Sequence, residues 1–263
     1  MKTTWFACIA LTALGATGCP DIDLDENEGL GGPVAEFDPA NRIIPFPNNL
    51  LLDPATGKVN LPAGCSPTGG PESPSAQALR ENVVNQLDGF GTFETTLNVT
   101  FTEPVDVASL VGRVFLYKVT ADPAESQAIP VIIVPNQTAR FDVNCANPQP
   151  VDQVTLIAAA DLDGDGVGDI PVPLDDKSTY VVGITEGVTS ATGRVFFPSP
   201  TWFLVRAVED PVTIDDNGLI VEDRTPLDPA EDEATLRGLD QLWNAHQQPL
   251  QSSRPRACPR TRS

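Results

Sequence analysis

Proline and glycine interrupt this chain so often that many short strands are favoured over long helices. The 263 residues include 26 prolines and 20 glycines, the residues that most strongly interrupt regular structure. The hydrophobic fraction is still 41%, which is sufficient for a packed core, so the chain as a whole is not a disordered one.

The segment 37–210 has the pattern of half-buried strands. Between residues 96 and 102, Leu97, Val99 and Phe101 alternate with polar residues, so these three side chains face one way. Further strands are expected at 113–119, 129–134, 139–143, 154–158, 179–185 and 201–206. Strands at this spacing, without intervening helices, predict an all-β, antiparallel, Ig-like sandwich with Greek-key connections.

Residues 1–18 are typical of a bacterial lipoprotein signal peptide. Lys2 supplies a positive charge, and the apolar segment 5–14 is too short to cross a membrane. The sequence Ala16-Thr17-Gly18-Cys19 is similar to a lipobox, although lipoboxes prefer leucine where Ala16 stands. We therefore expect Cys19 to be lipidated and to anchor the chain in a membrane. The alternative is an ordinary secretory signal.

Two features refine the expected location. Pro20, and not an aspartate, follows the cysteine, so the signal that retains lipoproteins at the inner membrane is missing. We therefore expect an outer-membrane lipoprotein, which could lie on either face of that membrane. Residues 19–36 are acidic and rich in glycine, and they are expected to form a flexible tether.

The charge of the chain excludes some partners. Residues 20–240 hold 36 acidic and 11 basic residues, a net charge of −25. A nucleic-acid partner requires a basic face that displaces counterions. Docking on anionic lipid requires a polybasic patch. Neither class of partner is expected.

The cysteines agree with export. Cys65 and Cys145 are expected to form a disulfide, which an oxidising compartment allows. A loop of this length would stabilise the fold by about 4 kcal/mol in the chain-entropy model. Cys258 is then unpaired, and three unpaired thiols are the alternative.

The segment 161–169 has the spacing of a calcium loop. Aspartates occupy positions 1, 3, 5 and 9, with Gly166 at position 6, and calcium prefers six to eight oxygen ligands. The predicted ligands are the carboxylates of Asp161, Asp163, Asp165 and Asp169 and the carbonyl of Val167.

This loop departs from the EF-hand pattern in two ways. Val172 stands at position 12, where a glutamate would bind the ion, so Asp175 or Asp176 would have to substitute. Helices are not expected on either side of the loop. The alternative is a solvated acidic turn without an ion.

Four segments together resemble a known exported module. The segments 97–110 and 179–193, with their turns of the Glu-Pro-Val-Asp and Ala-Thr-Gly types, are similar to a bacterial Ig-like domain. The segments 37–52 and 87–91 narrow the resemblance to the N-terminal domain of the bacterial virulence-factor lipase family. Members of that family are exported lipoproteins in which this module precedes an α/β-hydrolase, and the hydrolase is not in this chain.

The upstream segment also has a physical interpretation of its own. Two prolines hold Ile44-Pro45-Phe46-Pro47 extended. Phe46 and the leucines at 50–52 can then pack along the sandwich. We interpret this segment as a structural clasp, with a peptide or lipid groove around Phe46 as the alternative.

Residues for serine-hydrolase chemistry are not apparent. The nearest sequence to a Gly-x-Ser-x-Gly elbow is 64–68, which lacks the last glycine. His246, the sole histidine, lies near the end of an expected helix, so a Ser-His-Asp site is not expected. The chain is therefore predicted not to be an enzyme.

The C-terminal part is expected to be a helical connector, residues 211–247. Its helix is predicted at 228–246, with Asp228 and Glu231 forming a capping box. Two interpretations of this helix stay open: it packs on its own sandwich, or it docks on a following domain. Residues 248–263 are basic and atypical, and we interpret them as an out-of-frame or truncated end, with a basic binding tail as the alternative.

These features predict a lipid-anchored lipoprotein with a non-catalytic Ig-like module that presents, positions or recognises a partner and is stabilised by calcium. One alternative is the N-terminal part of a lipase or phospholipase, whose partner would be a downstream hydrolase domain. Another is an adhesin-like module that binds glycans or proteins as a surface ligand.

Overall fold

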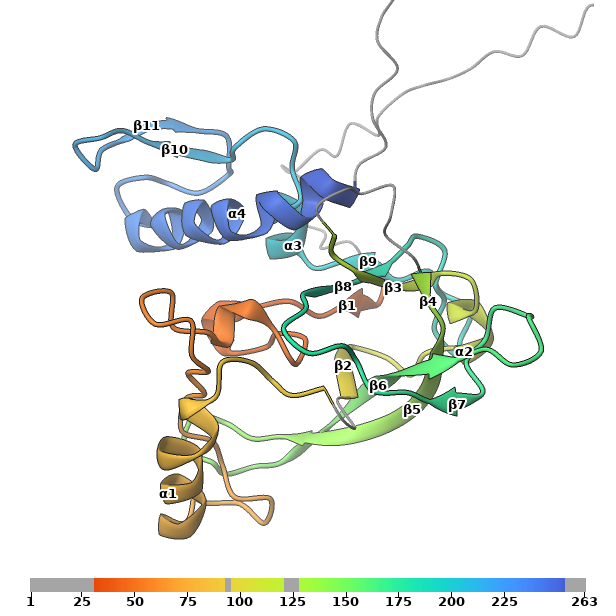
Figure 1. The fold of residues 1–263 in the computed structure, drawn as a ribbon. Coiled ribbons are helices and arrows are strands. Elements are labelled where there is room, and N and C mark those ends of the chain that lie inside the picture. Colours follow the sequence, from red (N-terminus) through yellow and green to blue (C-terminus); the bar gives the residue numbers. More distant parts are fainter. Residues whose placement is uncertain (1–30, 93–95, 121–127, 254–263) are drawn as a thin grey trace, which may run out of the picture. The chain divides into compact units, whose positions relative to one another are not determined.

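Strands dominate the structure, as the proline and glycine content predicts (Figure 1). The computed structural model describes residues 31–92, 96–120 and 128–253. Every helix and strand below belongs to the unit Gly32–Ser263. The prediction of a β-rich fold is confirmed at this level. The predicted signal peptide with Cys19, most of the tether and Cys258 lie outside the described residues.

The largest sheet has six strands in the order β5-β6-β2-β1-β9, and β7 pairs with β6 beside this path. The strands are β5 (Val131–Arg140), β6 (Gln149–Ala160), β2 (Thr96–Phe101), β1 (Val34–Ala35), β9 (Phe197–Pro198) and β7 (Ile170–Pro171). All pairs are antiparallel except β1 with β9, which is parallel. The sheet is therefore mixed, because β1 and the much later strand β9 run in the same direction.

A smaller sheet of three strands has the order β4-β3-β8. Its strands are β4 (Ala128–Ile129), β3 (Val114–Lys118) and β8 (Tyr180–Ile184). A one-turn helix, α2 (Val107–Leu110), precedes β3 and buries Leu110. Both neighbours of β3 pair with it antiparallel, as expected for this part of the chain.

Two clusters of buried side chains join these sheets. In one, Phe101 and Leu156 of the large sheet pack with Ile184 of the small sheet. In the other, Leu116 of the small sheet packs with Val131 of the large one. The predicted alternation in β2 is confirmed, because its apolar side chains join these clusters while the polar ones face away.

A third cluster forms around the C-terminal elements. Strands β10 (Val212–Ile214) and β11 (Ile220–Asp223) form a hairpin, and helix α4 (Glu233–Ser253) packs beside it (Figure 1). Leu236 and Leu239 of α4 are buried against Phe37. The segment 211–247, expected to be a helical connector, therefore contains a hairpin as well as a helix.

Two strand predictions were wrong or too long. The strand expected at 201–206 is helix α3 (Pro200–Val205), which begins because the Ser199 hydroxyl accepts the N–H of Trp202 at 3.1 Å and Pro200 suits the first turn. A short apolar run alone does not distinguish strand from helix. The strand expected at 139–143 is the end of β5, which runs without a break from Val131 to Arg140, so residues 141–143 lie outside it.

Helix α4 begins later than predicted. Asp228 caps a separate turn, because its carboxylate accepts the N–H of Ala230 at 2.8 Å. The carboxylate of Asp232, and not that of Glu231, returns to the N–H of Asp228 at 3.2 Å. The helix then runs from Glu233 to Ser253, so it extends into the segment expected to be an atypical tail.

Residues 37–90 form an irregular layer with short helices beside one end of the large sheet (Figure 1). These helices are η1 (Pro39–Asn41), η2 (Asn49–Leu51), α1 (Pro74–Asn82) and η3 (Val84–Gln86). Helix α1 was not predicted, although Ser73 followed by Pro74 is a helix-start signal. The Ser73 hydroxyl accepts the N–H of Ala76 at 3.2 Å.

Candidate functional site

The predicted calcium loop connects two paired strands. It leaves β6 at Ala160 and returns in β7 at Ile170, and these two residues are opposite each other in the sheet. The expectation that helices do not flank the loop is confirmed. Strand pairing therefore holds the two ends of the acidic segment together.

Three of the four predicted aspartates come together. The carboxylates of Asp161, Asp163 and Asp169 each place an oxygen within 4.8 Å of the others. The Asp161 carboxylate accepts the N–H of Gly164 at 2.7 Å and that of Gly166 at 2.8 Å. These contacts fold the loop back over Asp161.

Asp165 does not join this group. Among the described residues, the three clustered carboxylates do not include Asp165. Its carboxylate instead accepts the N–H of Val167 at 2.8 Å. The predicted spacing therefore brings together positions 1, 3 and 9 and leaves position 5 in a local turn.

The suggested substitutes for position 12 also lie elsewhere. Asp175 accepts a hydrogen bond from the Lys118 ammonium at 2.8 Å, and Asp176 accepts one from the Thr92 hydroxyl at 3.3 Å. Neither belongs to the clustered group. Both aspartates instead have partners of their own.

Backbone donors keep the central carboxylate ionised. The N–H groups of Gly166 and then Gly164 lower the pKa of Asp161 below its ordinary value, since hydrogen bonds to the charged form favour it. The group thus offers charged oxygen donors, the type that calcium prefers. Each carboxylate oxygen has two lone pairs, so the N–H bonds leave room for a cation. The three carboxylates could therefore hold a cation.

Glycines shape this loop at two kinds of position. Gly164 and Gly166 have φ of +80° and +86°, which side chains rarely tolerate. Gly168 is required for space, because an added Cβ would lie 2.4 Å from the Ala159 Cβ and 2.9 Å from the Val131 carbonyl carbon. The end of the loop therefore packs directly on β5 and β6.

The predicted disulfide is confirmed. Cys65 and Cys145 are joined, with their Cα atoms 5.2 Å apart. The N–H of Gly70 also donates to the carbonyl of Cys145 at 2.7 Å. The bond therefore links the irregular layer before α1 to the turn between β5 and β6.

The segment around Phe46 pairs with the large sheet. Phe46 exchanges two backbone hydrogen bonds with Asn98 of β2, at 3.0 and 2.6 Å, and its ring packs edge-on against Phe90 at 5.6 Å between centroids. The Asn48 side chain accepts the N–H of Leu50 at 2.9 Å and starts η2. These contacts fasten the segment to the sheet, as a structural clasp would.

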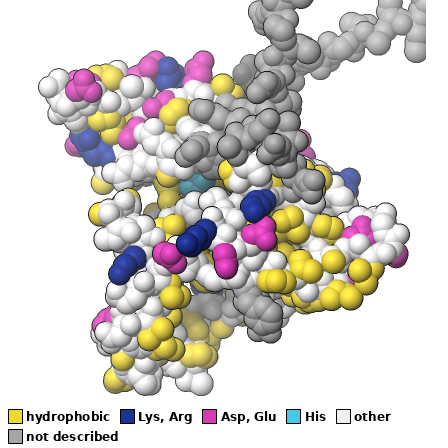
Figure 2. All heavy atoms as spheres, in the orientation of Figure 1, with side chains coloured by type: hydrophobic (Ala, Val, Ile, Leu, Met, Phe, Trp, Pro, Cys, Tyr) yellow, Lys and Arg dark blue, Asp and Glu magenta, His cyan; other side chains and the backbone are white. Residues whose placement is uncertain are grey.

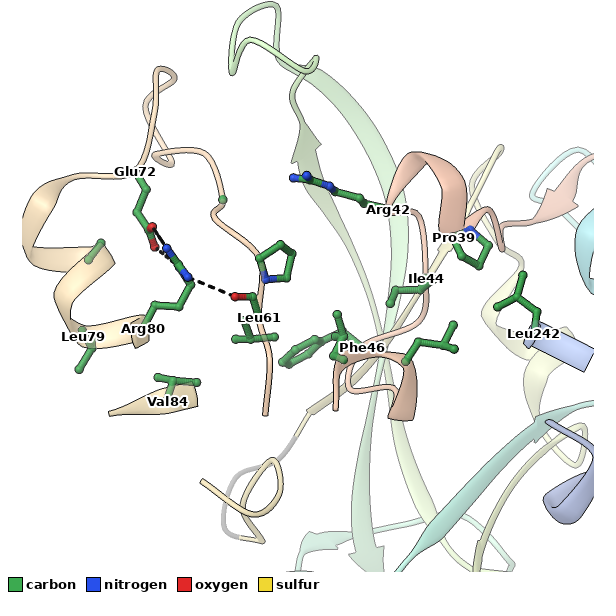
Figure 3. A pocket seen from close by; sticks show the side chains of 15 residues that line it. Pro39, Arg42, Ile44, Phe46, Leu61, Glu72, Leu79, Arg80, Val84 and Leu242 are labelled. Carbon is green, nitrogen blue, oxygen red and sulfur yellow. Dashed lines mark hydrogen bonds and ion pairs between the residues drawn. The ribbon is translucent and has the colours of Figure 1, made fainter. Parts of the chain in front are cut away.

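The same segment forms one wall of an apolar groove of about 670 Å³ (Figure 3). Helix α1 and the residues before it form the opposite wall, and Leu242 of α4 lies at one end (Figure 3). The lining includes Ile44, Phe46, Leu61, Leu79, Val84 and Leu242. A groove around Phe46 was expected from the sequence only as an alternative, because its second wall depends on the unpredicted helix α1.

Two arginines lie in the lining of the groove. Arg80 makes an ion pair with Glu72 at 2.9 Å and donates to the carbonyl of Leu61 at 3.2 Å (Figure 3). Arg42 belongs to the wall that the Phe46 segment forms, and its guanidinium points toward the α1 side (Figure 3). It donates a long hydrogen bond to the carbonyl of Ala63, at 3.5 Å.

The single histidine lies in an aromatic cluster. His246 packs edge-on against Phe37 and Trp202, at 5.8 and 5.4 Å between ring centroids, and its Nδ1 donates to the carbonyl of Leu242 at 2.8 Å. Ser66, in the sequence closest to a hydrolase elbow, shares a hydrogen bond with Thr68 at 3.1 Å. These two residues thus make separate local contacts.

Among the helices of the described ranges, none has the length and hydropathy that crossing a membrane requires. Comparison with known proteins found no matching family model, no matching curated protein and no matching solved structure. The functional interpretation of this chain therefore depends on its own residues.

Proposed function

We propose that this protein is an exported, lipid-anchored lipoprotein that carries a non-catalytic β-rich accessory module. The observation that supports export best is the disulfide between Cys65 and Cys145. Structural disulfides form and persist in oxidising compartments and are rare in the cytoplasm. The lipobox-like sequence that ends at Cys19 adds the expected anchor, and the outer membrane is the proposed location.

We further propose that the module is an Ig-like sandwich related to the N-terminal domain of virulence-factor lipases. Its support is the packing of a six-stranded and a three-stranded sheet around shared clusters of buried residues. Sandwiches bury the inner faces of two sheets in this manner. Such a module would position a partner and would not itself carry out chemistry.

Metabolic labelling with radioactive palmitate tests the anchor. Cells that express the full chain should incorporate label, and the Cys19→Ala variant should not. The matched control is Cys8→Ala, which removes the other cysteine of the expected signal region and should still be labelled. Label in the Cys19→Ala variant, or a protein recovered with reduced Cys65 and Cys145 in the cytoplasm, would contradict the proposal.

Calcium is the proposed cofactor of the module. Asp161, Asp163 and Asp169 would hold the ion, since their carboxylates converge. The bound ion would neutralise their mutual repulsion and fasten the loop between β6 and β7. Its role would be structural stabilisation. Affinity in the range common to extracellular modules, about 10⁻⁴–10⁻³ M, would be sufficient in an exported protein.

Thermal unfolding with calcium or chelator tests this cofactor. At about 10 mM calcium the melting temperature should rise by about 3–8 °C over its value in chelator. Asp163→Asn should abolish the rise. Asp165→Asn, at an exposed carboxylate two residues away and outside the cluster, should preserve it. A wild-type melting temperature that calcium does not change would establish the solvated turn instead.

A further inference from the structure

The groove between the Phe46 segment and helix α1 leaves large apolar side chains open to solvent. Leu79 is 57% exposed and Phe46 is 40% exposed, although both line the groove. Apolar surface of this kind, gathered in a concave site rather than scattered, is typical of ligand or partner sites. The groove volume of about 670 Å³ lies within the range of small-molecule sites.

The backbone on the α1 side of the groove is already occupied. The carbonyl of Leu61 accepts from Arg80 and Asn85, both at 3.2 Å, and the N–H of Leu61 donates to Asn85 at 2.9 Å. The carbonyl of Ala63 accepts from Arg42. An extended peptide binds mainly through backbone hydrogen bonds, and this wall offers few. The lining therefore suits an aliphatic chain better than a peptide.

The charge at the groove is that of one arginine without a carboxylate partner. Arg80 is neutralised by Glu72 in a two-pronged contact, from Nε to Oε1 at 3.1 Å and from Nη2 to Oε2 at 2.9 Å. Arg42 is exposed and forms no ion pair within the described ranges. On the face in Figure 2, basic side chains lie close to acidic ones. An unpaired guanidinium beside an apolar surface complements a carboxylate.

We propose that this groove binds a single-chain fatty carboxylate. The aliphatic tail lies between Phe46 and Leu79, and the carboxylate pairs with the guanidinium of Arg42. The tail would cover apolar side chains that are now exposed, and the head group would give Arg42 an anionic partner. The proposal does not depend on the lipid anchor or on calcium, so a failure of one proposal would not imply a failure of the other.

Isothermal titration of the purified chain with dodecanoate, below its micelle concentration, tests the proposal. Saturable binding is expected with one site. Arg42→Gln should weaken binding about tenfold, the loss of one charge-assisted contact. The control is Lys177→Gln, because Lys177 is also exposed with a positive φ of 51° but lies outside the groove lining. Dodecyltrimethylammonium should bind much more weakly, because Arg42 repels it.

A second pair of variants separates groove binding from general apolar adsorption. Ala76→Trp fills the groove from an exposed position of α1, whereas Ala78→Trp adds the same side chain two residues away, outside the lining. Ala76→Trp should abolish binding and Ala78→Trp should preserve it, with unchanged melting temperatures for both. Equal binding to these variants, equal binding of the cationic amphiphile, or no saturable binding at all would overturn the proposal.

Discussion

Glu36 and Arg140 form a two-pronged ion pair across the large sheet, although 104 residues separate them. The two guanidinium nitrogens lie 2.9 and 2.6 Å from the two carboxylate oxygens. Arg140 ends the long strand β5, and Glu36 directly follows β1. The pair therefore connects the N-terminal strand of the module to its outermost long strand.

The first prediction concerns the stability of this pair in acid. Burial raises the pKa of Glu36, but the hydrogen bonds and charge of Arg140, with Thr100, outweigh burial and leave the pKa below its ordinary value of 4.5. The stability that the ion pair contributes is therefore present above pH 4.5 and is lost as pH falls through the lowered pKa. Urea unfolding between pH 3 and pH 7 should show this loss.

A variant isolates the contribution of that carboxylate. Glu36→Gln should lower the free energy of unfolding at pH 7 by about 1–2 kcal/mol and should flatten its dependence on pH. The control is Glu103→Gln, which breaks the more exposed ion pair with Arg194 and should cost less than about 1 kcal/mol. Equal costs for the two variants would contradict the special role of Glu36.

The second prediction concerns the disulfide. Replacing Cys65 and Cys145 with serine should lower the free energy of unfolding by about 4 kcal/mol, because the unfolded chain gains the freedom that the closed loop removes. Chemical denaturation measures the loss. A thiol reductant should have a similar effect on the wild-type protein and none on the double variant. Equal stability of the double variant and the wild type would show that the bond is dispensable.

The third prediction concerns the packing of Gly168. Gly168→Ala should destabilise the fold by about 1–3 kcal/mol, because the added methyl would overlap Ala159 and the backbone of β5. Gly238→Ala, in α4 where an added Cβ meets nothing within 4 Å, should instead stabilise by up to about 1 kcal/mol. Thermal unfolding of the two variants should show shifts of opposite sign.

The fourth prediction concerns Ser199. Its buried hydroxyl accepts the N–H of Trp202 and donates to the carbonyl of Phe37 at 2.8 Å. Ser199→Ala removes a helix cap and leaves a buried carbonyl unpaired, so it should cost about 2–3 kcal/mol. Ser73→Ala removes only the exposed cap of α1 and should cost about 1 kcal/mol. Similar losses would argue against the role of the Phe37 contact.

The fifth prediction concerns Asp210. Burial and then the charge of Asp240 raise the pKa of Asp210, despite the N–H of Val212. A raised pKa in the folded state means that the contribution of this one carboxyl group to stability is greatest in acid and is lost as pH rises through that pKa. Asp210→Asn should therefore stabilise the protein at pH 7 by no more than about 1 kcal/mol, and the gain should vanish at low pH. A variant that is less stable at pH 7 would contradict this.

The predictions from the sequence succeeded where the signal was local. The alternation in 96–102 identified a strand and its buried face, because a period of two is a property of the strand itself. The aspartate spacing identified a loop that the structure closes between two strands. The run 201–206 was misassigned, because the helix start depends on the hydroxyl of Ser199 and not on the apolar residues.

The sequence by itself determined that the chain is rich in short strands, that its body is acidic, and that Asp161, Asp163 and Asp169 belong to one loop. The tertiary structure alone decided that Asp165 stays out of the carboxylate group, that Glu36 meets Arg140, and that α1 faces Phe46 across a groove. Strand patterns and loop spacings arise from neighbouring residues, whereas a cavity depends on segments that only folding brings together.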